Sequence, residues 1–158
     1  MAADDLPPPD LCAVVDTSVF IALLWGHGDI CVRLLELWES RRFVLVTSPQ
    51  LIAELREVLE RPKMRAHVDA AEAQALLAAL ELDAVVTPGE LTLPGATRDP
   101  KDDKVLACAL EGEVQFLITL DPDMLTLAVF QGVRIVNPVQ FVREWGHYSE
   151  DPKGLADL

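Results

Sequence analysis

The segment Cys12-Ala13-Val14-Val15-Asp16 decides the fold, because four apolar residues in a row end at a carboxylate. A run this short, without polar alternation, predicts a strand buried on both faces of a parallel sheet. Further apolar runs of the same kind lie at 43–47, 84–87, 115–119 and 133–136. The sequence therefore predicts a sheet of five buried parallel strands.

Helical patterns fill the intervals between these strands. Helices are predicted over 30–39, 50–60, 70–82 and 103–111, and short ones after Asp121-Pro122 and Asn137-Pro138. Ser48 followed by Pro49 is typical of a helix start, with Ser at the N-cap and Pro at the first helical position. Strands that alternate with helices indicate right-handed βαβ units, and hence a three-layer α/β/α domain.

The length of 158 residues suits one domain, which we expect over residues 11–147. Residues 1–10, acidic and proline-rich, and residues 148–158 are expected to be tails. The 13 Lys and Arg residues against 26 Asp and Glu give a net charge of −13. This charge excludes a generally basic nucleic-acid coat protein, so an anionic partner requires a local basic patch or bound cations.

The sequence favours a cytoplasmic protein that is not associated with a membrane. Cys12, Cys31 and Cys108 are odd in number and lack CxxC spacing, which predicts buried, reduced thiols. The first ten residues carry no positive charge, unlike a secretory signal. The longest apolar run, 19–25, is too short to span a bilayer.

Acidic residues follow two of the predicted strands at the point where each strand ends. Asp16 follows the first strand, and Asp121 and Asp123 follow the fourth. In α/β sheets, ligands bind beyond the carboxyl ends of the strands, near a switch point of the topology. These carboxylates are therefore expected at the ligand-binding edge.

Two helices add carboxylates at the same edge, because helices in such folds run antiparallel to the strands. Glu54 lies in the N-terminal half of the helix that follows the second strand. The helix before the fourth strand opens with three more acids, Asp99, Asp102 and Asp103. Four separate segments thus bring carboxylates to one edge of the sheet.

Crowded carboxylates raise one another's pKa and destabilise the fold unless a cation compensates. Oxygen-only ligands suit Mg²⁺ or Mn²⁺, and such ions promote hydrolysis of phosphodiesters by water. For any single acid, such as Asp99 before Pro100, helix capping or surface solvation is the simpler explanation. Capping does not require four segments to converge, so the convergence favours a metal site.

Four motifs in order give the chain a family resemblance. They are Val14 to Phe20, Ser48 to Leu59 with Arg61-Pro62-Lys63 following, Arg98 to Ala107, and Ile118 to Asp123. Over residues 12–145 the chain resembles the PIN-domain ribonucleases, in particular the branch related to VapC-like toxins of toxin–antitoxin systems. The resemblance implies a five-stranded parallel sheet of order 3-2-1-4-5.

The resemblance also implies the site residues. The family's acidic set falls on four residues, expected to be catalytic and to hold one or two Mg²⁺ or Mn²⁺ ions: Asp16, Glu54, Asp103 and Asp121. Ser18 stands where many relatives have Asn, and its hydroxyl can still orient a carboxylate or a water. Supporting roles are expected for Thr17, Ser18, Asp99, Thr119 and Asp123, with Thr119 within hydrogen-bonding reach of Asp16.

Of the acids that open the helix before the fourth strand, we expect Asp103 to be the metal ligand. The interval from Asp103 to Asp121 accommodates about two and a half helical turns, a turn and a strand that returns to the same edge. Asp102 would point about 100° away around the helix. Substitutions are therefore expected to damage activity in the order Asp103, Asp99, Asp102.

Basic residues lie just beyond Glu54 and form a candidate RNA-binding patch: Arg56, Arg61, Lys63 and Arg65. For Arg61 and Lys63, a solvated helix end is an equally good interpretation. His27, His67 and His147 share no ligand spacing and are expected at the surface or in packing.

The sequence thus predicts a metal-dependent endoribonuclease, and the resemblance favours the toxin of a toxin–antitoxin pair. An RNA-maturation nuclease and a non-catalytic PIN-like protein-interaction module remain alternatives. The phosphate-loop, Rossmann, G-x-S-x-G and H-E-x-x-H patterns are absent from the sequence. Besides RNA, the expected partners are an antitoxin protein and a second copy of the chain in a homodimer.

Overall fold

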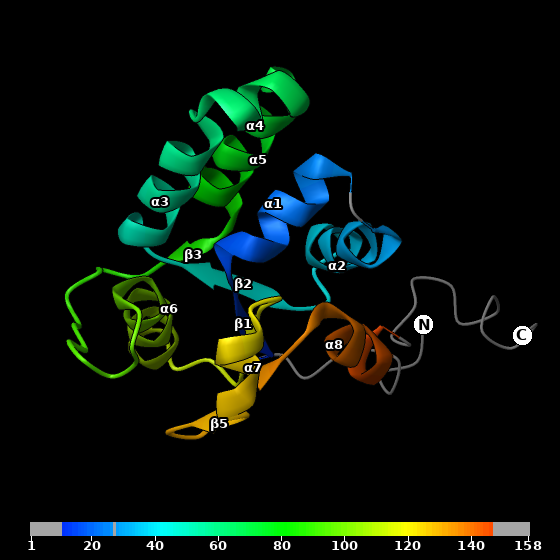
Figure 1. The fold of residues 1–158 in the computed structure, drawn as a ribbon. Coiled ribbons are helices and arrows are strands. Elements are labelled where there is room, and N and C mark those ends of the chain that lie inside the picture. Colours follow the sequence, from blue (N-terminus) through cyan, green and yellow to red (C-terminus); the bar gives the residue numbers. More distant parts are fainter. Residues whose placement is uncertain (1–10, 27, 147–158) are drawn as a thin grey trace, which may run out of the picture.

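A six-stranded sheet of order β3-β2-β1-β4-β6-β5 forms the centre of the protein. The computed structural model describes residues 11–26 and 28–146 (Figure 1). The strands are β1 (Cys12–Val15), β2 (Val44–Thr47), β3 (Val85–Val86), β4 (Phe116–Ile118), β5 (Val129–Phe130) and β6 (Val133–Val136). The predicted tails, together with His27 and His147, lie outside the described residues.

The predicted order of the five parallel strands is confirmed, with β6 as the fifth predicted strand. The strand β5 is an addition that pairs antiparallel with β6 at the sheet edge. The prediction that every strand is buried is wrong for β3, since Val85 and Val86 are both exposed. β3 is exposed because it is the last strand at the edge of the sheet opposite β5, with a neighbouring strand on one side only.

Helices cover both faces of the sheet (Figure 1). They are α1 (Thr17–Trp25), α2 (Asp29–Glu39), α3 (Pro49–Leu59), α4 (Pro62–His67), α5 (Ala70–Asp83), α6 (Pro100–Glu111), α7 (Pro122–Leu127) and α8 (Pro138–Trp145). The predicted helices all form, and α1 and α4 are additional. No single helix in the described residues is long and apolar enough to cross a membrane, and only α1 and α2 together, bent at their junction, reach that length and composition.

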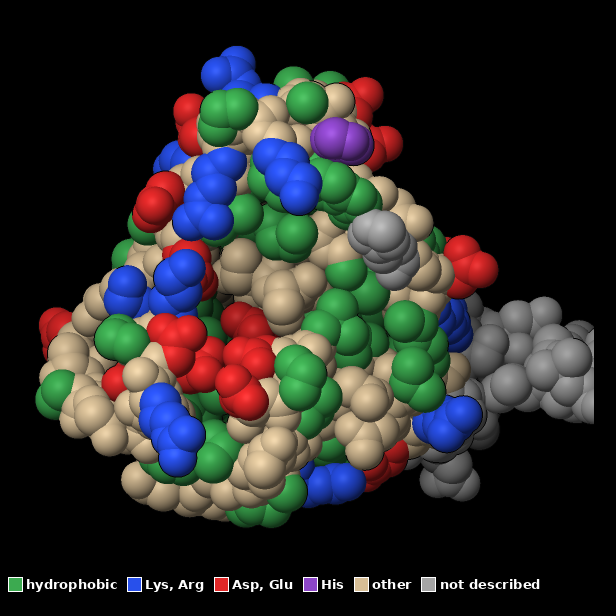
Figure 2. All heavy atoms as spheres, viewed as in Figure 1, with side chains coloured by type: hydrophobic (Ala, Val, Ile, Leu, Met, Phe, Trp, Pro, Cys, Tyr) green, Lys and Arg blue, Asp and Glu red, His purple; other side chains and the backbone are tan. Residues whose placement is uncertain are grey.

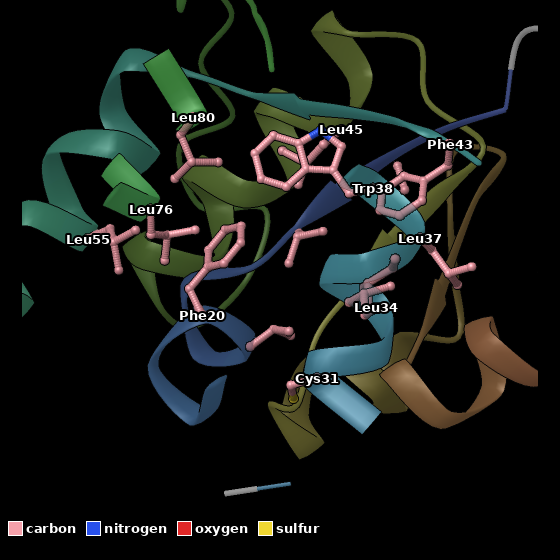
Figure 3. Packing of buried hydrophobic residues seen from close by; sticks show 14 of the residues in the cluster. Phe20, Cys31, Leu34, Leu37, Trp38, Phe43, Leu45, Leu55, Leu76 and Leu80 are labelled. Atoms are coloured by element: carbon pink, nitrogen blue, oxygen red, sulfur yellow. The ribbon is translucent and has the colours of Figure 1, made fainter. Parts of the chain in front are cut away.

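Alternating side chains of the central strands enter two separate cores. Ala13 and Val15 face the larger core, which α1, α2, α5 and α8 complete. Figure 3 shows part of this packing, with Phe20 and Trp38 among the labelled side chains. Val14 faces the smaller core, to which α6 and α7 contribute. The two cores explain why β1 is apolar at successive positions.

The thiols agree with expectation in their state and largely in their burial. All three cysteines are free; Cys31 and Cys108 are buried, while Cys12 is half-buried. Burial raises the pKa of the Cys31 thiol and raises that of Cys108 to about 11. Neither thiol is therefore suited to act as a nucleophile.

Parallel pairing of β1 with β4 determines where the chemistry-bearing residues lie. Val15 is opposite Ile118 in this register, so the residues that follow each strand, Asp16 and Thr119, emerge side by side. The edge at which they emerge is also where α1 and α7 begin.

Candidate functional site

Asp16 is buried at this edge, with 9% of its surface exposed. Its backbone N–H donates to the Ile118 carbonyl at 2.9 Å, which fixes the chain between β1 and α1. The Thr119 hydroxyl donates to Asp16 Oδ2 at 2.7 Å and the Ser18 hydroxyl to the same atom at 3.0 Å. Burial nevertheless raises the pKa of Asp16, and the nearby charge of Asp121 adds to that effect.

Thr119 joins the two strand ends through one fully buried hydroxyl. Its Oγ1 donates to Asp16 and accepts from the Asp121 backbone N–H at 3.0 Å. The Ser18 hydroxyl also joins the two strand ends, because it donates to Asp16 and its Oγ accepts from the Leu120 backbone N–H at 3.1 Å. The expected hydrogen bond between Thr119 and Asp16 is therefore confirmed.

Asp121 and Asp123 mark the start of α7. Asp121 is the N-cap, and its Oδ1 accepts from the Asp123 backbone N–H at 2.9 Å. Asp121 is half-buried, whereas Asp123 is exposed in the first turn of the helix. Of this pair, Asp121 is the one whose charge acts on Asp16.

Asp102, in the first turn of α6, completes a cluster of three carboxylates with Asp16 and Asp121. Its carboxyl group is in hydrogen-bonding contact with that of Asp121. Loss of hydration raises the pKa of Asp102 to about 7, with further contributions from the charges of Asp121, Asp99 and Asp16. We call Asp16, Asp102 and Asp121 the acidic cluster.

The Asp103 side chain is hydrogen-bonded to the connection between β3 and α6. Its Oδ1 accepts from the backbone N–H and the hydroxyl of Thr97, at 2.6 and 2.8 Å, and its Oδ2 accepts from the Gly95 N–H at 3.2 Å. Asp103 is 8% exposed. The prediction that Asp103 faces the other acids and Asp102 points away is therefore wrong. Successive helical side chains diverge by about 100°, and it is Asp102 that faces the cluster.

A signal for this register exists in the sequence. The helix α6 begins at Pro100, with Asp99 as its N-cap accepting from the Lys101 N–H at 2.9 Å. Ser48-Pro49 and Asp121-Pro122 begin α3 and α7 in the same way. Starting the helix at Pro100 rather than at Asp103 places Asp102 at its third position, in the first turn.

Glu54 reaches the start of α1 from α3. The Thr17 hydroxyl donates to Glu54 Oε2 at 3.0 Å, so Glu54 is held next to the residue that follows Asp16. Glu54 and Thr17 are both half-buried. The four predicted segments therefore do converge, and Asp102 replaces Asp103 as the contribution of α6.

Basic side chains flank the acids on the same face of the molecule (Figure 2). Arg56 is committed to an ion pair with Glu81 of α5 at 2.6 Å, and Arg61 lies 3.9 Å from Glu57. Lys63 and Arg65 are exposed on α4. Of the predicted basic patch, α4 thus presents exposed cations, while Arg56 serves a structural contact.

The donor chemistry of the acidic cluster fits a hard divalent cation. Three carboxylates from separate segments lie together, and oxygen-only ligands of this kind suit Mg²⁺ or Mn²⁺. As the side chains stand, no three His, Cys, Asp or Glu residues within 11–26 and 28–146 are arranged to hold one ion. The fit of a divalent cation to the acidic cluster therefore rests on the chemistry of its carboxylate oxygens and on the negative charge that the three carboxylates bring together.

Comparison with known proteins agrees with this fold. An uncharacterized protein of Methanocaldococcus jannaschii, MJ1680, is 28% identical over 116 residues, which are 72% of this chain and 73% of that protein. PAE2754 of Pyrobaculum aerophilum superposes with a TM-score of 0.55 at 18% identity, covering 86% of this chain and 90% of that one. VapC20 of Mycobacterium tuberculosis, described as a toxin that cleaves the sarcin–ricin loop, gives 0.51 at 22% identity, covering 77% and 98%.

The profile of the PIN domain matches residues 12–123. That range begins with β1 and ends at Asp123, so it contains the whole acidic cluster, Glu54 and the hydroxyls that orient them. The chain belongs to the PIN domain family.

Proposed function

We propose that this protein is a divalent-metal-dependent endoribonuclease, with the acidic cluster as the ligand set for Mg²⁺ or Mn²⁺. The observation that carries the proposal is that Asp121 lies beside both Asp16 and Asp102, in hydrogen-bonding contact with Asp102, while the pKa is raised at Asp16 and Asp102. Like charges held together cost stability, and a bound cation offsets that cost. Membership of the PIN domain family supports nuclease activity in general.

The remaining polar residues position the cluster. Ser18 and Thr119 orient Asp16, and Thr17 holds Glu54 beside it. When bound, the cation supplies charge stabilisation for the phosphodiester and lowers the pKa of an attacking water. Exposed cations on α4 offset the repulsion between an RNA backbone and a chain of net charge −13.

We further propose that the activity is that of a toxin restrained by an antitoxin protein, and that the chain forms a homodimer. The fold shared with VapC20 supports the first proposal. An apolar groove of about 960 Å³ between α1, α2 and α5, with Leu82 81% exposed, supports association with another protein surface. A monomer in light scattering at high concentration would count against the dimer, and a pull-down without a tight partner against the antitoxin.

The nuclease proposal is tested with single-stranded RNA in Mg²⁺ or Mn²⁺, with EDTA as the blank. Asp16→Asn should abolish cleavage while retaining the far-UV circular dichroism of the wild type. The control is Asp123→Asn, since Asp123 is exposed and outside the cluster. If Asp16→Asn cleaves RNA as well as the wild type does, the site is assigned wrongly.

Metal binding has an independent readout in stability. Mn²⁺ should raise the Tm of the wild type, because a ligand that binds only the folded state stabilises it. The increase should be smaller in Asp102→Asn and unchanged in Asp123→Asn. An equal increase in all three proteins would remove Asp102 from the ligand set.

A further inference from the structure

A cavity of about 250 Å³ lies between α6, the start of α3 and the connection from β3 to α6. Its walls are mainly apolar, formed by Leu91, Leu93, Pro94, Pro100 and Ala107. Polar groups are few: Ser48 and Gln50 on the side of α3, and Lys104 on the side of α6, are among them. Apolar walls with a few polar groups are typical of small-molecule sites.

The connection that roofs the cavity is held by two carboxylates of α6. Glu111 accepts from the backbone N–H groups of Gly89, Glu90 and Leu91 at 2.8 to 2.9 Å. Two helical turns earlier, Asp103 accepts from the Gly95 and Thr97 N–H groups. The roof is therefore anchored at both ends, and the cavity is preformed.

A third anchor joins the roof to α3. Gln50 Nε2 donates to the Gly89 carbonyl at 2.7 Å. Gly89 has a φ of +72°, and a Cβ there would lie 2.5 Å from Gln50 Oε1, so this close approach requires glycine.

The cavity adjoins the acidic cluster through one turn of α6. Pro100 and Asp103 line the cavity, while Asp102 between them faces Asp16 and Asp121. Figure 2 shows apolar side chains next to the acids on this face. The cavity and the acidic cluster therefore border the same first turn of α6, and a phosphodiester at the cluster has a neighbouring nucleotide on the side of the cavity.

We propose that this cavity binds a nucleobase of single-stranded RNA, that of the nucleotide next to the cleaved phosphodiester. The inference rests on the proposed nuclease function. The cavity is below the roughly 300 Å³ at which sites for drug-sized ligands begin, so it suits a single ring system. Every Phe and Trp side chain in the described residues is buried or half-buried, so these rings provide no fully exposed stacking platform. The cavity is an apolar surface that borders the acidic cluster.

The test begins with a random-sequence single-stranded RNA, cleaved by the wild type in Mn²⁺ and sequenced at the cut ends. The cavity predicts a base preference at one position next to the cut. Removing the base at that position, by an abasic substitution, should lower kcat/KM by about tenfold, the size expected for loss of contacts in an apolar pocket.

Variants then connect this preference to the cavity. Ala107→Met fills it from α6 and should flatten the preference, while cleavage of the abasic RNA stays at the wild-type rate. Leu91→Trp fills it from the roof, where Leu91 is 39% exposed and a larger side chain is tolerated, and should act in the same way. Val139→Met, on α8 where Val139 is 37% exposed and lines neither the cavity nor the groove, is the matched control and should leave the preference unchanged.

Two results would overturn the inference: equal cleavage of abasic and intact RNA by the wild type, or an unaltered preference in both filling variants. Either is expected if the cavity instead receives a side chain of a protein partner. If the wild type cleaves no RNA at all, the proposed function fails. The affinity of the Asp16→Asn variant for RNA then tests the cavity separately from cleavage. Intact RNA should bind about tenfold more tightly than abasic RNA, and equal affinities would overturn the inference.

Discussion

Asp102 and Asp103 are adjacent in the chain but have different structural roles. Asp102 contacts Asp121 and has a pKa of about 7, whereas Asp103 accepts three hydrogen bonds from residues 95 and 97. A carboxylate already occupied by three donors is satisfied without a cation. A carboxylate beside another one is not, which is why we propose Asp102 as the ligand from α6.

The raised pKa of Asp102 predicts how stability depends on pH in metal-free protein. The folded state binds the proton more tightly than the unfolded state, whose pKa is about 3.9. The contribution of Asp102 to the free energy of unfolding therefore falls as pH rises from about 4 to about 7. Because Asp102 is partly exposed, we expect a loss of about 1–2 kcal/mol, less than the full shift implies.

Urea unfolding in EDTA at pH 5 and pH 8 measures this effect. The wild type should lose more stability between the two values than Asp102→Asn, and Asp123→Asn should behave as the wild type does. The same pH dependence in Asp102→Asn and the wild type would contradict the assignment.

Thr119 is expected to position Asp16 through its hydroxyl. Thr119→Val keeps the shape but leaves Asp16 Oδ2 and the Asp121 N–H without this partner. We expect a loss of about 1–3 kcal/mol in unfolding free energy, and weaker Mn²⁺ binding. Thr119→Ser retains the hydroxyl and should recover most of the Mn²⁺ affinity. Equal Mn²⁺ affinities in the Val and Ser variants would leave Thr119 with a packing role only.

At the scale of elements, α6 carries both the proposed ligand Asp102 and two carboxylates, Asp103 and Glu111, that anchor the connection from β3. Asp103→Ala should speed hydrogen exchange at the Gly95 and Thr97 amides, and lower the unfolding free energy by about 1–3 kcal/mol. Glu111→Ala should instead speed exchange at Gly89 to Leu91. Each variant is the control for the other, and identical exchange patterns would contradict separate anchoring.

The elements that could be predicted from sequence are those with a local signal. The apolar runs predict the strands, and Ser48 and Asn137 do cap α3 and α8. The helix α1 is apolar at nearly every position, so it shows no helical periodicity, although only Val19 and Phe20 of its residues are buried. The two residues of β5 have no signal of their own and depend on pairing with β6.

The sequence predicts at which edge of the sheet the candidate site lies, but not every residue of the site. Asp16 and Asp121 follow from the strand ends, and Glu54 from the direction of α3. The choice between Asp102 and Asp103 is missed because the helix is expected to start at Asp103 and not at Pro100. The contacts of Asp103 are with residues 95 and 97, which precede the helix and have no local signal in the sequence.

At the scale of the whole molecule, the proposed binding of RNA to a chain of net charge −13 requires local cations. Lys63→Glu should raise KM for RNA and flatten its salt dependence with little change in kcat, since a contact with single-stranded phosphate contributes about −0.7 to the salt slope. Arg143→Glu, on α8, changes the net charge equally and is the control. The same effect from both variants would point to net charge rather than to a patch on α4.

The central claim is that Asp16, Asp102 and Asp121 form the metal-dependent site of a nuclease. The most direct test is the rate of RNA cleavage at saturating Mn²⁺ by Asp102→Asn and Asp103→Asn, each compared with the wild type. We expect Asp102→Asn to lose about 100-fold or more, because even groups that only orient a metal ligand are worth about 10–100-fold. Asp103→Asn should retain activity within about tenfold of the wild type. An active Asp102→Asn beside an inactive Asp103→Asn would contradict the account.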